Sequence, residues 1–160
     1  MNLPNKLTLL RILLIPVFII IMMLDIPNHY LIACLIFVVA SITDALDGYI
    51  ARKNDLVTDF GKFMDPLADK LLVISALICM IESNLVAGWM VIIIVARELT
   101  VSILRAIAAA DGKVIAASGG GKIKTISQML AVIILLLGAN LSNNLLLQVG
   151  TIFMLIATFF

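Results

Sequence analysis

Six long apolar segments, separated by short polar breaks, run from one end of the chain to the other. They cover residues 7–24, 30–51, 62–82, 85–110, 123–140 and 144–160. Each is close to the roughly 20 residues that a helix needs to cross the hydrocarbon core of a membrane. A helix satisfies its own backbone hydrogen bonds, which lipid cannot do. The pattern therefore predicts an all-α, polytopic membrane protein with six transmembrane helices, preceded by a short interfacial segment over residues 1–6.

The composition supports this class of protein. The chain has 160 residues, 63% of them hydrophobic, and a mean hydropathy of +1.21. A water-soluble domain of this length needs a polar surface, and this chain has too few polar residues to form one. No small-residue cleavage site follows the first apolar segment, so we expect a retained span rather than a signal peptide. We predict a single membrane domain over residues 1–160, with membrane lipids and no nucleic acid among its partners.

The basic residues are distributed unevenly between the two ends of the apolar segments. The connections 25–29, 82–84 and 140–144 contain no Lys or Arg. All eleven basic residues lie toward the opposite ends: Lys6, Arg11, Arg52, Lys53, Lys62, Lys70, Arg97, Arg105, Lys113, Lys122 and Lys124. Loops rich in Lys and Arg stay in the cytoplasm. The sequence thus predicts a multi-pass protein of the cell (inner or plasma) membrane, with its polar site facing the cytoplasm.

Several charged residues lie too deep in the segments to be ordinary flanking charges. Counted from the predicted outer ends, Asp44, Asp69, Arg97, Arg11 and Lys124 lie 12 to 16 residues inside five different segments. At ~1.5 Å per residue this is about 18–24 Å from the outer interface. Long Lys and Arg side chains can reach back to the interface, but Asp cannot. Because ionised groups in hydrocarbon are costly, we expect the segments to share a water-filled cavity open to the cytoplasm.

Four carboxylates recur at helical spacing on the second and third segments. Asp44 and Asp47 are three residues apart, while Gly61, Asp65 and Asp69 follow at intervals of four. Each set therefore lies on one face of its helix. Gathered in one pocket, the four acids would repel each other and take up protons unless they bound a cation. Carboxylate oxygens suit Mg²⁺, which usually shares its coordination shell with water and substrate phosphates.

Part of this pattern also has a purely structural explanation. Asp65 and Pro66 fit a helix N-cap followed by proline at the first helical position. This explanation leaves Asp44, Asp47 and Asp69 unexplained, so the metal-site prediction does not depend on it.

The acids belong to a longer motif that spans two predicted helices. It reads D-x2-D-G-x2-A-R-x8-G-x3-D-x3-D, with its fixed positions at Asp44, Asp47, Gly48, Ala51, Arg52, Gly61, Asp65 and Asp69. This motif resembles the signature of the CDP-alcohol phosphotransferase family. The segments P-N-K-L-T-L-L-R at 4–11, A-R-E-L at 96–99 and G-K-I-K-T-x2-Q at 121–128 are similar to one branch of it, the bacterial phosphatidylglycerophosphate synthases.

The resemblance implies an activity and a set of site residues. It implies transfer of the phosphatidyl group from CDP-diacylglycerol to sn-glycerol 3-phosphate, giving phosphatidylglycerol phosphate and CMP in phospholipid biosynthesis. Two Mg²⁺ or Mn²⁺ ions would be held by Asp44, Asp47, Asp65 and Asp69, and Asp69 would also act as general base. The resemblance places the CDP moiety along Asp44, Asp47, Gly48, Ala51, Arg52, Gly61 and Asp65. It further implies a homodimer.

The acceptor is a phosphate monoester and needs cations to bind it. Arg binds phosphate bidentately and Lys supplies a compact charge. The candidates are Arg97, Arg105, Lys122 and Lys124, with Thr8 and Arg11 completing the pocket. Glu98, seven residues before Arg105, is expected to orient that arginine. The glycines at 119–121 fit either a hinge, a phosphate-binding nest of backbone N–H groups or a plain linker, and the cations themselves also fit positive-inside charges without a ligand.

Three other functions compete with this one. A sister enzyme of the family would use the same donor with another acceptor alcohol. An intramembrane prenyltransferase also binds diphosphate through Mg²⁺ and aspartates, but it would leave Gly48, Ala51, Arg52 and Gly61 without a role. A divalent-cation transporter needs polar residues through the outer half of the membrane, where 31–43, 70–81 and 85–96 are almost wholly apolar. The sequence favours an enzyme whose site opens on one side only.

Overall fold

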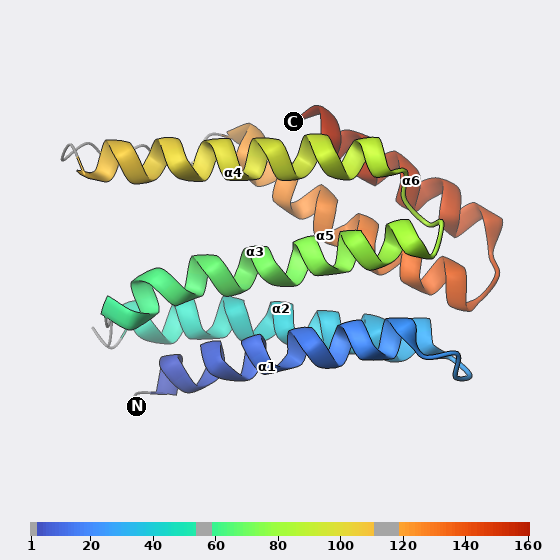
Figure 1. Ribbon diagram of the computed structural model, residues 1–160, viewed down its shortest axis with the longest axis horizontal. Helices are drawn as coiled ribbons and strands as arrows, with labels where there is room; N and C mark the ends of the chain where they lie inside the picture. The colour runs from blue at the N-terminus through green and yellow to red at the C-terminus, as the bar shows by residue number, and fades with distance from the viewer. Residues whose placement is uncertain (1–2, 54–58, 111–118) are drawn as a thin grey trace.

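The computed structural model describes residues 3–53, 59–110 and 119–160; within these ranges the side chains of 3–7, 44–53, 59–66, 69 and 110 are not described. The described chain forms six α-helices and no β-strand, and consecutive helices run in opposite directions (Figure 1). They are α1 (Leu3–Met23), α2 (His29–Lys53), α3 (Asp59–Glu82), α4 (Gly88–Ala110), α5 (Gly119–Asn140) and α6 (Asn144–Phe159). Each helix corresponds to one of the six apolar segments, so the all-α prediction is confirmed.

Two predicted boundaries are wrong. Helix α1 begins at Leu3, so residues 3–6 form its first turn rather than a separate interfacial segment. Pro4 allows this, because the first backbone N–H groups of a helix have no partner in any case. Helix α3 begins at Asp59, so Asp65 and Pro66 lie inside it and do not form its start. A proline inside a helix removes one hydrogen bond, and α1 likewise continues through Pro16.

The core lies where α1, α2 and α3 pack together and where α2 meets α5. Phe18 of α1 and Phe37 of α2 are fully buried, with ring centroids 6.3 Å apart and tilted by 54°. Ala33, Ala40 and Ala76 are also fully buried. Small side chains at such positions let helix backbones approach closely, which is how helices associate where lipid replaces water. Helix α4 lies at the edge, and among the described helices its backbone closely approaches only α3 and α6.

The α5–α6 hairpin is the most closely packed pair of helices. The side chain of Asn143 caps α6 by accepting hydrogen bonds from the backbone N–H groups of Leu145 (3.0 Å) and Leu146 (3.3 Å). Further along the hairpin, Gly150 faces Leu135 so closely that a β-carbon there would lie 2.6 Å from the Leu135 Cγ. The absence of a side chain at Gly150 therefore sets the distance between these two helices.

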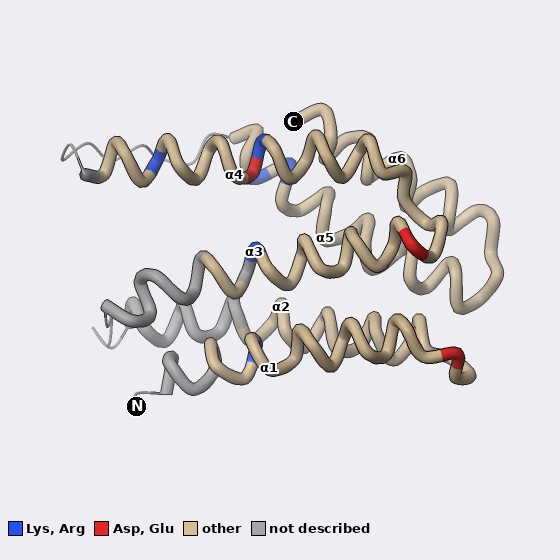
Figure 2. The backbone as a smooth tube through the Cα atoms, in the orientation of Figure 1, with Lys and Arg blue, Asp and Glu red and all other residues tan. Residues whose placement is uncertain are grey.

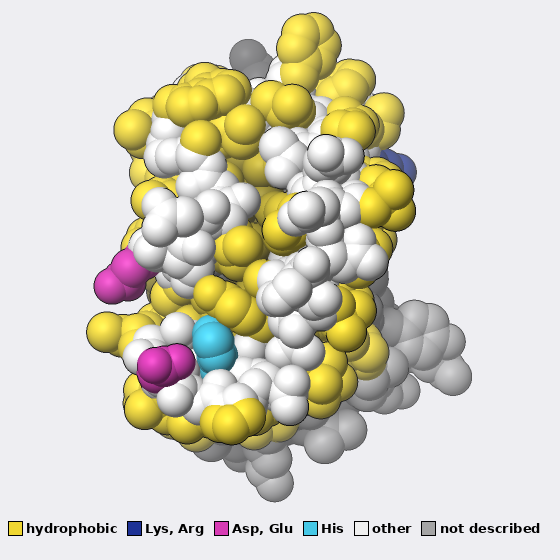
Figure 3. Space-filling model, turned by 90° about the vertical axis from the view of Figure 1, so that its right-hand side faces the viewer, with side chains coloured by type: hydrophobic (Ala, Val, Ile, Leu, Met, Phe, Trp, Pro, Cys, Tyr) yellow, Lys and Arg dark blue, Asp and Glu magenta, His cyan; other side chains and the backbone are white. Residues whose placement is uncertain are grey.

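The sides of the bundle are apolar. Ile92 and Met23 expose 69% and 68% of their surface, and many other Leu and Ile side chains are exposed as well. Apolar side chains surround the end of the molecule that carries the short loops (Figure 3). A water-soluble protein does not expose this much apolar surface. Counting described residues only, one helix, Gly119–Asn140, is long and apolar enough to cross a membrane, and Thr8–Met23, His29–Thr43 and Asn144–Phe159 are shorter apolar helices.

The charges divide along the length of the bundle. Asp25 and Glu82 lie in or beside the loops that join α1 to α2 and α3 to α4. Figure 2 shows no Lys or Arg at that end among the described residues; the basic positions lie in the other half of the bundle. The described Lys and Arg residues are therefore confined to one half of the bundle, as the sequence predicted.

Gly150→Ala tests the packing of the α5–α6 hairpin. The added methyl group must displace Leu135, so we expect a loss of about 1–3 kcal/mol in the free energy of unfolding. The measurement is the unfolding midpoint of the purified protein in detergent. Gly88→Ala is the matched control, because a β-carbon at Gly88 meets no atom within 4 Å. Equal midpoints for the two variants would contradict the role of Gly150.

Candidate active site

The four aspartates of the signature lie on two neighbouring, antiparallel helices. Asp44 and Asp47 belong to α2, Asp65 and Asp69 belong to α3, and the two helices contact each other. Asp47 lies six residues before the end of α2 and Asp65 six residues after the start of α3. At ~1.5 Å per residue, the two positions are at a similar level in the bundle. The backbone thus brings together α2 and α3, the two helices that carry the aspartates, with Asp47 and Asp65 at a similar height along the bundle.

The side chains of the signature lie outside the described residues. This applies to every predicted metal and CDP ligand: Asp44, Asp47, Gly48, Ala51, Arg52, Gly61, Asp65 and Asp69. Among the side chains that are described, no group of three His, Cys, Asp or Glu could hold a metal ion. The metal site, the CDP site and the general base therefore stay predictions.

A cationic pocket of about 380 Å³ lies beside these helices, between α3, α4 and α5. It collects three of the four cations predicted to bind the acceptor, together with a fourth, Lys70. Its lining residues are Lys70, Arg97, Glu98, Val101, Ser102, Arg105, Gly121, Lys122, Thr125 and Ile126. Four positive side chains and one carboxylate give this pocket the charge that an anionic ligand requires.

The remaining predicted cation, Lys124, is engaged in an ion pair. Its ammonium group donates a hydrogen bond to Oε2 of Glu98, and Arg97 Nη1 lies 3.9 Å from the same oxygen. Lys124 is almost completely buried, so its charge is balanced inside the protein rather than in water. The predicted pairing of Glu98 with Arg105 is not the one observed, although both residues line the cationic pocket.

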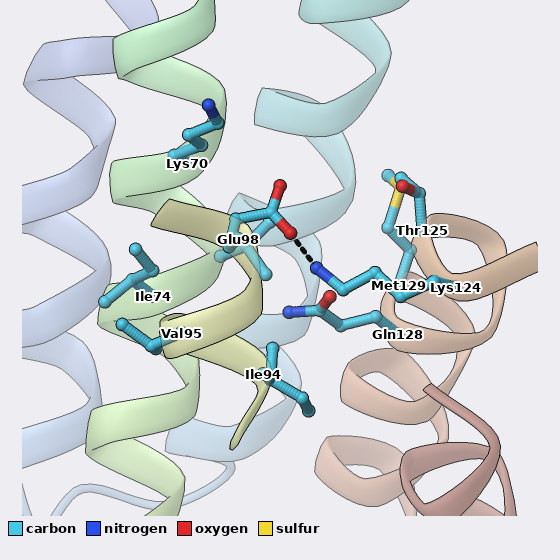
Figure 4. A pocket seen from close by; sticks show the side chains of 10 residues that line it. Lys70, Ile74, Ile94, Val95, Glu98, Lys124, Thr125, Gln128 and Met129 are labelled. Carbon is cyan, nitrogen blue, oxygen red and sulfur yellow. Dashed lines mark hydrogen bonds and ion pairs between the residues drawn. The ribbon is translucent and has the colours of Figure 1, made fainter. Parts of the chain in front are cut away.

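A second, smaller cavity of about 30 Å³ adjoins this pocket, and we call it the inner chamber. The two cavities share Lys70, Glu98 and Thr125. The rest of the inner chamber is lined by Val73, Ile74, Ile94, Val95, Lys124, Gln128 and Met129. Figure 4 shows these side chains around the Glu98–Lys124 ion pair, with the Gln128 amide beside it.

Lys70 and Ser102 belong to the site although sequence reasoning gave them no role. The Lys70 ammonium donates a hydrogen bond to Ser102 Oγ, and that hydroxyl donates to the Glu98 carbonyl oxygen at 2.6 Å. These bonds join α3 to α4 at the pocket wall. Lys70 directly follows Asp69 in the sequence, which is the signal that could have drawn attention to it.

The first turn of α5 forms part of the pocket wall. The glycines at 119–121 are helical, so they are neither a hinge nor a linker, and Gly121 and Lys122 line the cationic pocket. Backbone N–H groups at a helix start have no intrahelical partner and favour anions. A β-carbon at Gly120 would lie 3.4 Å from the ring of Phe160, which is an ordinary van der Waals contact and does not require glycine there.

Thr8 and Arg11 line neither of these two cavities. Both are completely buried on α1, three residues apart and therefore on one face of that helix. Among the described helices α1 contacts α2 and α3, so this face is turned toward the helices that carry the aspartates. Their assignment to the acceptor pocket stays a prediction.

Comparison with known proteins agrees with this architecture. A family model described as CDP-alcohol phosphatidyltransferase matches residues 1–160. A Bacillus subtilis protein named CDP-diacylglycerol–glycerol-3-phosphate 3-phosphatidyltransferase is 51% identical over 148 residues, which cover 85% of this chain and 77% of the relative. A Rickettsia bellii protein of the same name is 46% identical over 159 residues, 99% of this chain and 88% of the relative.

A more distant relative is a Mycobacterium tuberculosis protein named as a probable phosphatidylglycerophosphate synthase. It is 42% identical over 134 residues, which cover 82% of this chain and 64% of the relative. The family match spans the whole chain and includes the two helices with the signature aspartates. This chain is therefore a membrane protein of the CDP-alcohol phosphatidyltransferase family.

Proposed function

We propose that this protein transfers the phosphatidyl group of CDP-diacylglycerol to sn-glycerol 3-phosphate, giving phosphatidylglycerol phosphate and releasing CMP. The names of the Bacillus and Rickettsia relatives support this activity. The observation that carries the proposal is the cationic pocket next to α3, one of whose cations, Lys70, directly follows Asp69. An anionic acceptor in this pocket lies beside the helix that carries the proposed base.

The cationic pocket binds the phosphate group of the acceptor. Lys70, Arg97, Arg105 and Lys122 supply four positive charges. The single carboxylate, Glu98, would repel a phosphate dianion, but its ion pair with Lys124 neutralises it. Arginine adds bidentate hydrogen bonds, and the start of α5 adds backbone N–H groups. An acceptor without a phosphate, such as serine, would leave these cations without a counter-charge.

The donor set on α2 and α3 fits divalent metal ions. Asp44, Asp47, Asp65 and Asp69 offer only hard oxygen ligands, and the two helices are neighbours at the matching level. We assign these four residues to the ions, with Mg²⁺ or Mn²⁺ as the metal. When bound, such ions neutralise the diphosphate and the charge that develops on it during transfer. Gly48, Ala51, Arg52 and Gly61, together with Asp44, Asp47 and Asp65, are assigned to the CDP moiety.

The chemical step is a displacement at phosphorus. Asp69 takes the proton from the acceptor hydroxyl, and that oxygen forms a bond to the β-phosphorus of CDP-diacylglycerol. The bond from the β-phosphorus to the bridging oxygen breaks, and CMP leaves with that oxygen. The chain contributes mainly by positioning the two anionic substrates and balancing their charge, which is the largest part of catalysis in phosphoryl transfer.

We also propose that all six helices cross the cell membrane and that the site faces the cytoplasm. The described Lys and Arg residues lie in the half of the bundle away from Asp25 and Glu82, which is the positive-inside arrangement. The substrates fit this orientation, because glycerol 3-phosphate and CMP are water-soluble anions. A homodimer stays a prediction from the family resemblance.

The acceptor is identified by incubating the purified protein with CDP-diacylglycerol, Mg²⁺ and a panel of labelled alcohols. We expect label to enter lipid from glycerol 3-phosphate and not from serine or from inositol phosphate. Transfer to another member of the panel would replace the proposed acceptor while leaving the donor and the family unchanged.

Asp69→Asn removes the proposed general base. We expect kcat to fall by about 10²–10⁴-fold, the usual contribution of a positioned base. CMP release measures the rate, and a folding check in detergent accompanies it. Asp25→Asn is the control, since Asp25 is exposed at the opposite end of the bundle. Near-normal turnover of folded Asp69→Asn protein would show that another group takes the proton.

Metal removal tests the assignment of the four aspartates. Because the diphosphate needs a counter-charge, we expect excess EDTA to reduce CMP release to background and added Mg²⁺ or Mn²⁺ to restore it. A matching concentration of Na⁺ controls for ionic strength. Turnover that persists after exhaustive chelation would rule out metal dependence.

Arg105→Ala separates acceptor binding from donor binding. Loss of a charge-assisted hydrogen bond to the acceptor phosphate is expected to raise the KM for glycerol 3-phosphate by about 10–100-fold. The KM for CDP-diacylglycerol should stay within about twofold. Arg105→Lys keeps the charge and should fall between wild type and Ala. An equal rise in both KM values would argue against this role.

A further inference from the structure

One buried polar side chain in the site has no role in the mechanism above. Gln128 of α5 is only 4% exposed, and its amide points into the inner chamber (Figure 4). The interactions found for the part of the chain that the structure describes include none made by this amide. The amide atoms are not sealed inside the protein, because they remain accessible from the chamber that Gln128 lines. A glutamine in this position therefore suits a ligand that exchanges hydrogen bonds with its amide when it enters the chamber.

The inner chamber admits only a small group. Its volume of about 30 Å³ is space for one or two water-sized groups. Apart from the residues it shares with the cationic pocket, its walls are mostly apolar, with Val73, Ile74, Ile94, Val95 and Met129. A sugar or inositol ring is too large for this space, whereas a single hydroxyl fits.

The charge of the chamber disfavours a cationic group. Glu98 and Lys124 form an ion pair at its wall, and Lys70, whose ammonium is bonded to the neutral Ser102 hydroxyl, adds one positive charge. An ammonium group entering the chamber would lose its hydration without gaining a counter-charge. An amide provides both a hydrogen-bond donor and an acceptor, and a hydroxyl needs one of each.

The chamber is also in the right place relative to the acceptor. Lys70, Glu98 and Thr125 line both cavities, so a ligand with its phosphate in the cationic pocket has its carbon chain next to the chamber. Lys124 and Gln128 lie four residues apart on one face of α5. The polar groups of both cavities therefore face the same bound molecule.

We infer that Gln128 is a specificity-determining residue that binds the secondary hydroxyl of a three-carbon phosphorylated acceptor inside the inner chamber. This inference rests on the proposed function and deepens it, because it states which part of the acceptor is recognised apart from its phosphate. The attacking primary hydroxyl is bound elsewhere, on the side of Asp69. Gln128 thus distinguishes glycerol 3-phosphate from acceptors that lack the hydroxyl or replace it with a cationic or bulky group.

The test compares two acceptors with each enzyme variant. Glycerol 3-phosphate carries the secondary hydroxyl, and 3-hydroxypropyl phosphate lacks it but keeps the primary hydroxyl and the phosphate. The quantity measured is the ratio of kcat/KM for the two acceptors, with CDP-diacylglycerol and Mg²⁺ fixed. Because both acceptors are assayed on one preparation, the ratio does not depend on the fraction of folded protein. This keeps the test valid even for a variant that folds poorly.

For wild type we expect glycerol 3-phosphate to be preferred by about 100-fold, since the analogue leaves the amide of Gln128 without a hydrogen-bonding partner. Gln128→Leu should reduce that preference by about tenfold or more, mainly through the loss of activity on glycerol 3-phosphate. Gln128→Met, closer in shape, should behave in the same way. Gln148→Leu is the matched control, because Gln148 is an exposed glutamine on α6 and should keep the wild-type ratio.

The outcomes separate the inference from the proposed function. A wild-type preference that Gln128→Leu and Gln128→Met leave unchanged, or an equal loss on both acceptors, would show that Gln128 has only a structural role and overturn the inference. Failure of the wild-type protein to use glycerol 3-phosphate at all would instead overturn the proposed function.

Discussion

The burial of charge inside an apolar bundle is the constraint on which the rest of this structure depends. Ionised groups are costly in hydrocarbon, so each must have a partner, a ligand or access to water. The Glu98–Lys124 ion pair meets this requirement inside the protein, and the cationic pocket meets it by holding Arg97, Arg105, Lys70 and Lys122 around a common space. The polar site is therefore confined to one half of the bundle.

The same polar contacts also hold α4 in place. Among the described helices the backbone of α4 closely approaches only α3 and α6, and much of its length is exposed. Side chains bridge the wider gap to α5 through the Lys124–Glu98 ion pair, and the Lys70–Ser102 hydrogen bond joins α4 to α3. The ion pair lies at the wall of the inner chamber and the hydrogen bond at the wall of the cationic pocket. The residues that shape the acceptor site thus contribute to the position of the helix that supplies Arg97 and Arg105.

In the proposed function, the two adjoining cavities divide acceptor recognition between the phosphate group and a hydroxyl group. Phosphate binding by several cations gives affinity, but it does not distinguish one phosphorylated alcohol from another. Discrimination needs a polar group that loses its hydrogen bonds when the wrong alcohol binds. The amide of Gln128, a residue that is only 4% exposed, is proposed to be such a group.

The sequence by itself determined the helices and the chemistry of the residues. Apolar segments of membrane-spanning length indicated six helices, the spacing of the aspartates predicted metal binding, and the resemblance of their motif to a family signature predicted nucleotide binding. The boundaries at Leu3 and Asp59 were missed, because proline is compatible both with a helix start and with a helix interior. Arg97, Arg105 and Lys122 were predicted as one group and do line one pocket.

Only the tertiary structure decided which polar groups meet. The sequence placed Lys124 with the phosphate-binding cations and Glu98 with Arg105, but the packing of α4 beside α5 pairs Glu98 with Lys124. Lys70 and Gln128 gained roles for the same reason, since they lie on different helices and meet only where α3, α4 and α5 converge. Spacing along one helix fixes which side chains share a face, whereas partners on other helices depend on how the bundle packs.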